Sequence, residues 1–161
     1  MADQDEFKDP LRVFQFMVEA ETSSGGRIVG AFSEFSGINM TLETVQARSG
    51  DDIFGVQEYI PALTRFEPVT LSKGVIGDNE FIEWLFQAAP RPNSQPKGGA
   101  DLYRNLNVVA WDGLYERGVI WTLKNAMPIG YQLGGMDASR SEILVETMTF
   151  AITGMDRTIM E

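Results

Sequence analysis

Serine hydroxyls and carboxylates are the side chains of this sequence that most readily suggest chemistry, because the 161 residues include no His and no Cys. Ser33 and Ser36 lie in the segment GAFSEFSG. A serine nucleophile needs a neighbouring base, usually His, and this segment does not match Gly-x-Ser-x-Gly. We therefore interpret both serines as turn or strand-end residues. The same absences disfavour Ser-His-Asp hydrolases, zinc enzymes and Cys nucleophiles.

The carboxylates show no metal-binding spacing. Asp51, Asp52 and Asp137 lack the alternating oxygen ligands and the terminal Glu of a calcium loop, so we expect solvated loops there. A glycosidase needs two carboxylates across a sugar, and the 23 acidic residues single out no such pair. Glu146 shares a period-2 face with apolar Leu144 and Met148, which favours a structural carboxylate at the rim of the core. We expect no metal, no cofactor and no enzymatic activity.

Composition disfavours nucleic-acid readers and membrane spans. Thirteen Lys and Arg against 23 Asp and Glu give a formal charge of −10, which is unsuited to gripping a phosphate backbone. Gly25-Gly26 and Gly98-Gly99 lack the residues that complete a phosphate loop. No apolar run is long enough to span a bilayer, and the opening MADQDEFKD has no signal-peptide pattern. We expect no sequence-specific nucleic-acid binding and no membrane span.

Strand patterns dominate the chain, and the length and the 43% apolar content favour one domain over residues 1–161. Proline and three glycines predict that residues 125–135 form a bent segment. The predicted fold is mostly β, a β-sandwich or small β-barrel with one packed α-helix. The expected strands are 11–21, 27–35, one beginning at 38, 64–73, 102–111, 119–123 and 143–153.

One helix is predicted over residues 78–89. Asp78 can cap its N-terminus, and Glu80 and Glu83 lie in the first turns, where the helix dipole favours negative charge. Phe81, Trp84, Leu85 and Ala88 form an apolar stripe at helical spacing. All three tryptophans, Trp84, Trp111 and Trp121, lie in amphipathic patterns typical of a core or an interface.

Residues 43–60 are predicted to form an extended hairpin arm. The turn residues 49–52 mark its tip, and the flanking segments are β-capable but carry few strong apolar anchors. Unpaired strand edges are templates for pairing with another chain, so the arm is expected to find its partner on a neighbouring copy.

The order of these segments resembles the tail tube protein family of contractile phage tails and phage-like contractile injection systems. The resemblance covers about residues 9–155, although Met127 stands where many relatives are expected to have Trp. The matching segments are DPLRVFQFMVE (9–19), GAFSEFSGI (30–38), residues 43–50, VTLSKGV (69–75), NEFIEWL (79–85) and residues 121–155 with their Asn-Ala-x-Pro turn and final Glu-containing strand.

This resemblance implies a structural subunit. Family members form hexameric rings that stack into a hollow inner tube, and a contractile sheath drives this tube through a target envelope. The implied partners are further copies of the chain, sheath subunits, baseplate and tube-terminator proteins, and a tape-measure protein, DNA or protein cargo in the lumen. The implied location is the bacterial cytoplasm during synthesis, and then a phage tail or injection particle.

Candidate contact residues follow from the arm, the aromatic positions and the family helix, which is expected on the outside of the tube. Candidates for sheath contact are Asp78, Glu80 and Glu83. Candidates for contacts between subunits are Phe32, Phe35, Glu43, Arg48, Asp51, Asp52, Ile53, Phe54 and Tyr59.

Three other functions remain open on the sequence. A haemolysin-coregulated-type ring protein of type VI secretion would share the fold. A monomeric carbohydrate-binding module would use Trp111 or Trp121 as an exposed platform. A β-sandwich glycosidase is the remaining alternative.

Overall fold

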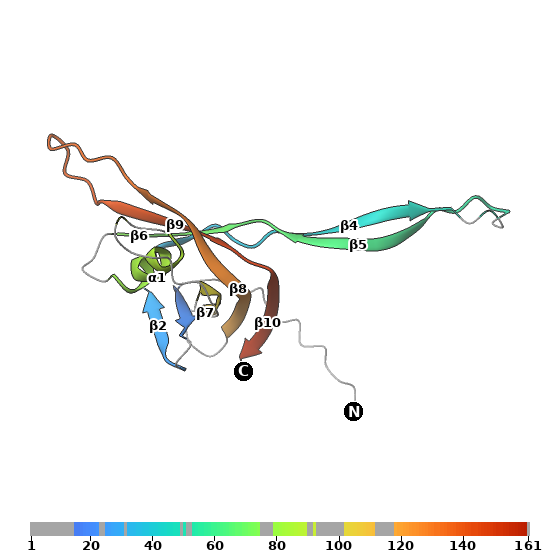
Figure 1. Ribbon diagram of the computed structural model, residues 1–161, viewed down its shortest axis with the longest axis horizontal. Helices are drawn as coiled ribbons and strands as arrows, with labels where there is room; N and C mark the ends of the chain where they lie inside the picture. Colours follow the sequence, from blue (N-terminus) through green and yellow to red (C-terminus); the bar gives the residue numbers. More distant parts are fainter. Residues whose placement is uncertain are drawn as a thin grey trace, which may run out of the picture.

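Ten strands and one helix form within the residues that the structure describes (Figure 1). The computed structural model describes residues 15–22, 25–30, 32–48, 50, 53–74, 79–89, 92, 102–111 and 118–160. The elements are β1 (Gln15–Glu21), β2 (Arg27–Gly30), β3 (Glu34–Phe35), β4 (Met40–Ala47), β5 (Glu58–Phe66), β6 (Val69–Gly74), α1 (Glu80–Ala88), β7 (Arg104–Trp111), β8 (Gly118–Leu133), β9 (Val145–Ala151) and β10 (Gly154–Met160). The prediction of a mostly β chain with one helix is confirmed.

An antiparallel eight-stranded sheet forms the body, in the order β2-β1-β7-β8-β9-β6-β3, with β10 also paired to β8. The 16-residue strand β8 connects the two halves of this sheet. Its first half pairs with β7 and β10, and its second half, from Met127 to Leu133, pairs with β9. The segment predicted to be bent, 125–135, is thus a paired strand as far as Leu133, and it contains an irregularity of the kind that bends a strand. Proline is accommodated by a register shift between Pro128 and Gly130, where a missing N–H is tolerated.

The core lies between the two halves of the sheet and beneath α1. Trp84 is fully buried, its Nε1–H donates to the Leu102 carbonyl oxygen at 2.8 Å, and its ring centroid lies 5.3 Å from that of Phe150. The helix begins after Asn79, which forms no side-chain cap, and the predicted cap Asp78 lies outside the described residues. The largest fully buried side chains are Trp84, Phe81, Phe150, Leu71, Leu106, Leu123, Met148, Val18, Val69 and Val108.

The strands β4 and β5 form a separate two-stranded sheet that projects from the body (Figure 1). Their register runs from Met40 opposite Phe66 to Ala47 opposite Glu58. We call residues 40–66 the arm. It extends beyond the predicted 43–60, and the predicted strand 64–73 is divided between β5 and β6. The division falls at Pro68, which has no N–H to donate, and the Glu67 N–H closes the root of the arm on the Asn39 carbonyl oxygen at 3.1 Å.

The predicted strand over 27–35 is also divided, into β2 and β3. Gly30 allows the chain to fold closely here, because an added Cβ would lie 2.3 Å from Cε2 of Phe32. The Phe32 ring is thereby packed edge-on against Phe81, with centroids 5.1 Å apart. Within the described part of the chain, no helix has the length and apolar character needed to cross a bilayer.

Candidate assembly surfaces

The arm exposes apolar side chains on both of its faces. A two-stranded hairpin has no second layer on which to bury them. At the tip, Ile53 is 94% exposed and Phe54 is 89% exposed, and Tyr59 is exposed at the start of β5. The other large exposed apolar side chains of the arm are Met40, Leu42, Val45, Val56, Ile60 and Leu63. An exposed apolar surface of this kind is typical of a protein-contact site.

Charged residues of the arm interact partly with the arm itself. The Glu43 carboxylate pairs with the Arg65 guanidinium of the adjacent strand at 2.7 Å, which stabilises the hairpin. Arg48 is exposed near the tip, with its guanidinium 3.0 Å from the position of an added Cβ on Gly55. Asp51 and Asp52, both predicted contacts, lie outside the described residues.

An open apolar groove of about 620 Å³ lies at the edge of the core. One wall is the segment 33–38, and the other is the inner face of β1, β7, β8 and β10. The predicted contact Phe35 lines this groove, whereas Phe32 is only 6% exposed and belongs to the core. Contact of Phe32 with a neighbour stays a prediction, for a side chain that is already largely buried within one copy. We call this the apolar groove; its lining includes Phe16, Phe35, Ile38, Trp121, Met155 and Glu34.

A second surface is formed by small uncharged residues on the outer side of β6, β9 and the second half of β8. Strand alternation places Leu71 and Met148 in the core and their neighbours on the opposite side. Ser72 lies opposite Thr147, and their hydroxyl oxygens are 2.9 Å apart. None of the described residues facing outward from these three strands is charged. We call this the hydroxyl face: Thr70, Ser72, Thr147, Thr149, Gly130 and Gln132.

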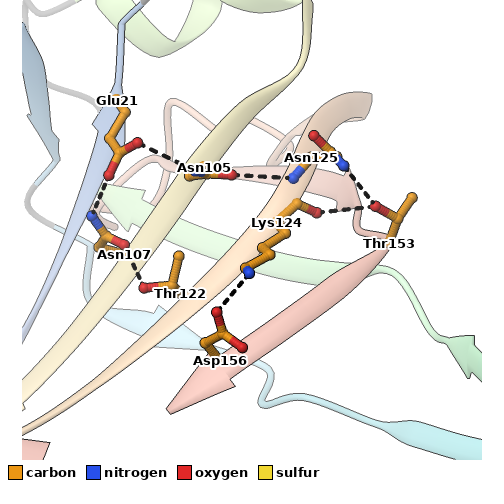
Figure 2. A network of polar contacts seen from close by, with 8 residues as sticks. All are labelled: Glu21, Asn105, Asn107, Thr122, Lys124, Asn125, Thr153 and Asp156. Carbon is orange, nitrogen blue, oxygen red and sulfur yellow. Dashed lines mark hydrogen bonds and ion pairs between the residues drawn. The ribbon is translucent and has the colours of Figure 1, made fainter. Parts of the chain in front are cut away.

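A polar network covers the outer side of β1, β7, β8 and β10 (Figure 2). The Glu21 carboxylate accepts hydrogen bonds from the side-chain amides of Asn105 and Asn107, each at 3.3 Å. Asn107 in turn accepts a hydrogen bond from the Thr122 hydroxyl at 2.9 Å. These bonds link three neighbouring strands.

The other part of the network joins β8 to β10 and the residue before it. The Lys124 ammonium is 2.6 Å from the Asp156 carboxylate, and the Asn125 side-chain amide donates to the Thr153 hydroxyl at 3.2 Å (Figure 2). Asn125 has a φ of 52°, a backbone conformation that asparagine tolerates better than most residues. The charged groups in this view thus have partners within the chain, and the network stabilises the sheet.

Two further carboxyl groups in the described part of the chain are engaged in local hydrogen bonds. Glu146 is 7% exposed and accepts a hydrogen bond from the Tyr131 hydroxyl at 2.9 Å, and this bond raises the pKa of Tyr131. The Ser139 hydroxyl and N–H both donate to Asp137, which lowers the pKa of this carboxyl group. Among the described residues, no three His, Cys, Asp or Glu side chains gather as metal ligands would.

Two of the three predicted sheath contacts lie on α1. Glu80 and Glu83 are exposed in its first turn. Asp78 is outside the described residues, so its position beside them is untested. The exposed carboxylates give this end of the helix a negative surface.

The profile of the family described as T4-like virus tail tube protein gp19 matches residues 12–156. The chain belongs to this tail tube family. The resemblance found in the sequence is thereby confirmed. No curated protein sequence matches the chain. The family is one of structural tube proteins.

Solved structures of injection particles and of a tail contain the same fold. A chain of the anti-feeding prophage baseplate superposes with a TM-score of 0.74 and 21% identity, over 94% of this chain and 97% of that one. A chain of the extended sheath–tube complex of the PVC extracellular contractile injection system gives 0.71 and 20%, over 96% and 95%. A chain from the gene transfer agent tail is more distant, at 0.54 and 12%, over 89% and 95%.

Two surfaces of this tail tube protein were not anticipated from its sequence. The hydroxyl face joins residues about 75 positions apart, such as Ser72 and Thr147, and only the register between β6 and β9 places them together. The alternation of Thr with apolar residues in β9 was the available signal. The apolar groove depends on the path of segment 33–38 over the sheet, for which the sequence carries no comparable signal.

Proposed function

We propose that this chain forms the hollow inner tube of a contractile tail or injection particle, with six copies in each ring and the rings stacked along a common axis. Membership of the tail tube family carries this proposal. The six-fold symmetry is supported by the baseplate structure of the anti-feeding prophage, which is described as 6-fold symmetrised and contains a chain of the same fold.

The arm is the element that best suits contact between copies. It projects from the body, and its apolar residues are exposed in the isolated chain (Figure 1). Six copies would bring together six times the −10 charge of one chain, so burial of apolar area and pairing of strand edges have to outweigh this repulsion. The arm offers both.

The hydroxyl face is our candidate for the wall of the lumen. The arm continues along the chain from β3 into β4 and from β5 into β6, and the β8–β9 hairpin extends the same half of the sheet at the other end (Figure 1). Because the arm and the β8–β9 hairpin extend this half of the sheet at both ends, it is suited to form a wall that runs along the tube axis. An uncharged hydroxyl surface would neither attract nor repel DNA or a polypeptide moving past it.

The proposed partners of the tube are inferred from the particles whose structures contain a chain of this fold. The extended sheath–tube complex of the PVC system contains a chain of this fold, which supports a sheath as partner of this tube. The structures of the PVC terminator and the anti-feeding prophage cap support a terminator, and the baseplate structure supports a baseplate partner. We assign the sheath contact to Glu80 and Glu83 at the start of α1.

Electron microscopy of the purified protein tests the function. We expect annular particles or hollow rods with six-fold symmetry in end-on views. A compact monomer at every concentration, with no rods even in the presence of sheath and baseplate proteins, would contradict the proposal.

A further inference from the structure

We propose that the apolar groove of one copy receives the arm tip of a second copy, with Ile53 and Phe54 seated between segment 33–38 and the sheet. This inference deepens the proposed function, on which it rests, by naming the acceptor surface for the arm. It combines two features of the same chain: an apolar tip that is almost fully exposed and a groove that leaves one end of the core open.

The groove has the size and lining of a binding site. Its volume of about 620 Å³ falls within the range of roughly 300 to 1,000 Å³ that is usual for pockets that bury a ligand. Val108 and Ala110 are buried core residues that also line it. The rings of Phe16, Phe35 and Trp121 pack against that core and remain partly exposed. An apolar insert would therefore complete a hydrophobic layer that one copy leaves unfinished.

A copy cannot fill its own groove with its own tip. The root of the arm, where Met40 pairs with Phe66, begins two residues after Ile38, which lies on the rim of the groove. The eight residues of β4 then carry the tip about 26 Å away, at about 3.3 Å per residue. Because the tip and the groove of one copy lie apart, the tip of each copy docks into the groove of another. This is a head-to-tail contact, which extends from copy to copy.

One pair of charged residues on the two surfaces has opposite signs. Arg48 lies beside Gly55 at the tip, and Glu34 is exposed at the rim of the groove. Docking of Ile53 and Phe54 would bring this cation toward this carboxylate. Such rim pairs set orientation and suppress wrong partners more than they add affinity.

Disulfide cross-linking provides a clean test because the native chain has no Cys. The double variant Ser33→Cys/Gly50→Cys carries one thiol at the groove and one at the tip, where an added Cβ meets no neighbour, and it keeps both Ile53 and Phe54. After mild oxidation of assembled material, we expect a ladder of covalent multimers on a non-reducing gel, which reduction abolishes. The matched control Gly50→Cys/Thr158→Cys places the second thiol on the outer side of β10 and should give no ladder.

The outcomes separate this inference from the proposed function. Rods that form without a ladder, or a ladder of equal strength in the control, would overturn the docking and leave the tube intact. An internal cross-link within the monomer would show that the tip reaches its own groove. Protection of the Ser33→Cys thiol from maleimide in dilute, unassembled protein would show that the same chain covers the groove. Absence of both rods and ladder would contradict the docking and the tube together.

A charge exchange tests the orientation. Arg48→Glu and Glu34→Arg should each weaken assembly several-fold, and the double variant should recover most of it. As a control, Ile143→Asp alters another exposed apolar residue, which lies on the β8–β9 loop, and should leave tip–groove cross-linking unchanged. If the double variant loses as much assembly as the two single variants added together, these two residues do not meet.

Discussion

Shortening the arm should separate folding of the body from assembly. Val45 and Ile60 are direct partners across the hairpin, so residues 46–59 can be replaced by Asn-Gly to give a two-residue turn between them. Of the removed residues that the structure describes, none belongs to the buried core. We therefore expect the free energy of unfolding to change by less than about 1 kcal/mol, or about 2–4 °C in Tm for a chain of this size.

Assembly should respond far more strongly. Burying an apolar side chain of this size contributes about 1.5–3 kcal/mol, so losing Ile53 and Phe54 together removes at least about 3 kcal/mol per contact. This corresponds to an affinity between copies that is at least about a hundredfold weaker. Circular dichroism measures Tm, and electron microscopy with light scattering measures rods against protein concentration.

A control and two contrary results define the test. Ile143→Ser removes an apolar side chain that is 83% exposed on the β8–β9 loop, and it should assemble like the native chain. Ordinary rods from the shortened protein would show that the arm does not connect copies. A fall in Tm of more than about 10 °C would show that the body depends on the arm for its stability.

Three further outcomes are expected. Glu80→Lys/Glu83→Lys should weaken sheath attachment in co-sedimentation and leave tube formation intact, with Gln variants in between; normally sheathed particles would refute this. Trp84→Phe should destabilise the chain by about 1–3 kcal/mol, measured by urea unfolding, because it removes a buried hydrogen bond and ring volume. Tyr131→Phe should lower stability by about 1 kcal/mol below pH 10, since it loses the bond to Glu146. Because the folded state raises the pKa of Tyr131, this difference should vanish as the pH rises through that pKa, and a constant difference up to pH 12 would contradict it.

The helix and the arm illustrate how much the sequence could predict. The spacing of Phe81 and Trp84 predicted the buried face of α1, because helical periodicity directly reports which side is apolar. The arm was predicted from its lack of apolar anchors, yet its true length depends on Pro68 and on the root bond at Asn39. Local pattern thus indicates an element, and tertiary contacts set its ends.

The strand β10 shows where local pattern fails. Residues 154–160 mix apolar and polar side chains on both sides, with Met155 beside the groove and Ile159 exposed, so period 2 gives no clear signal. This strand exists because the edge of β8 is available to it over seven residues. Glu146 was predicted at the rim of the core, but its partner Tyr131 lies on a segment for which only a bend was predicted, with no strand partner named.

The long strand β8 has a mechanical consequence. It is flanked by β7 and β10 along its first half and by β9 along its second. Inter-strand hydrogen bonds lie perpendicular to the strands, so a pull along β8 would load many of them together in shear instead of opening them one by one. A subunit built around this continuously paired strand resists stretching along it. This is a useful property in a rod that has to be pushed through a barrier without buckling.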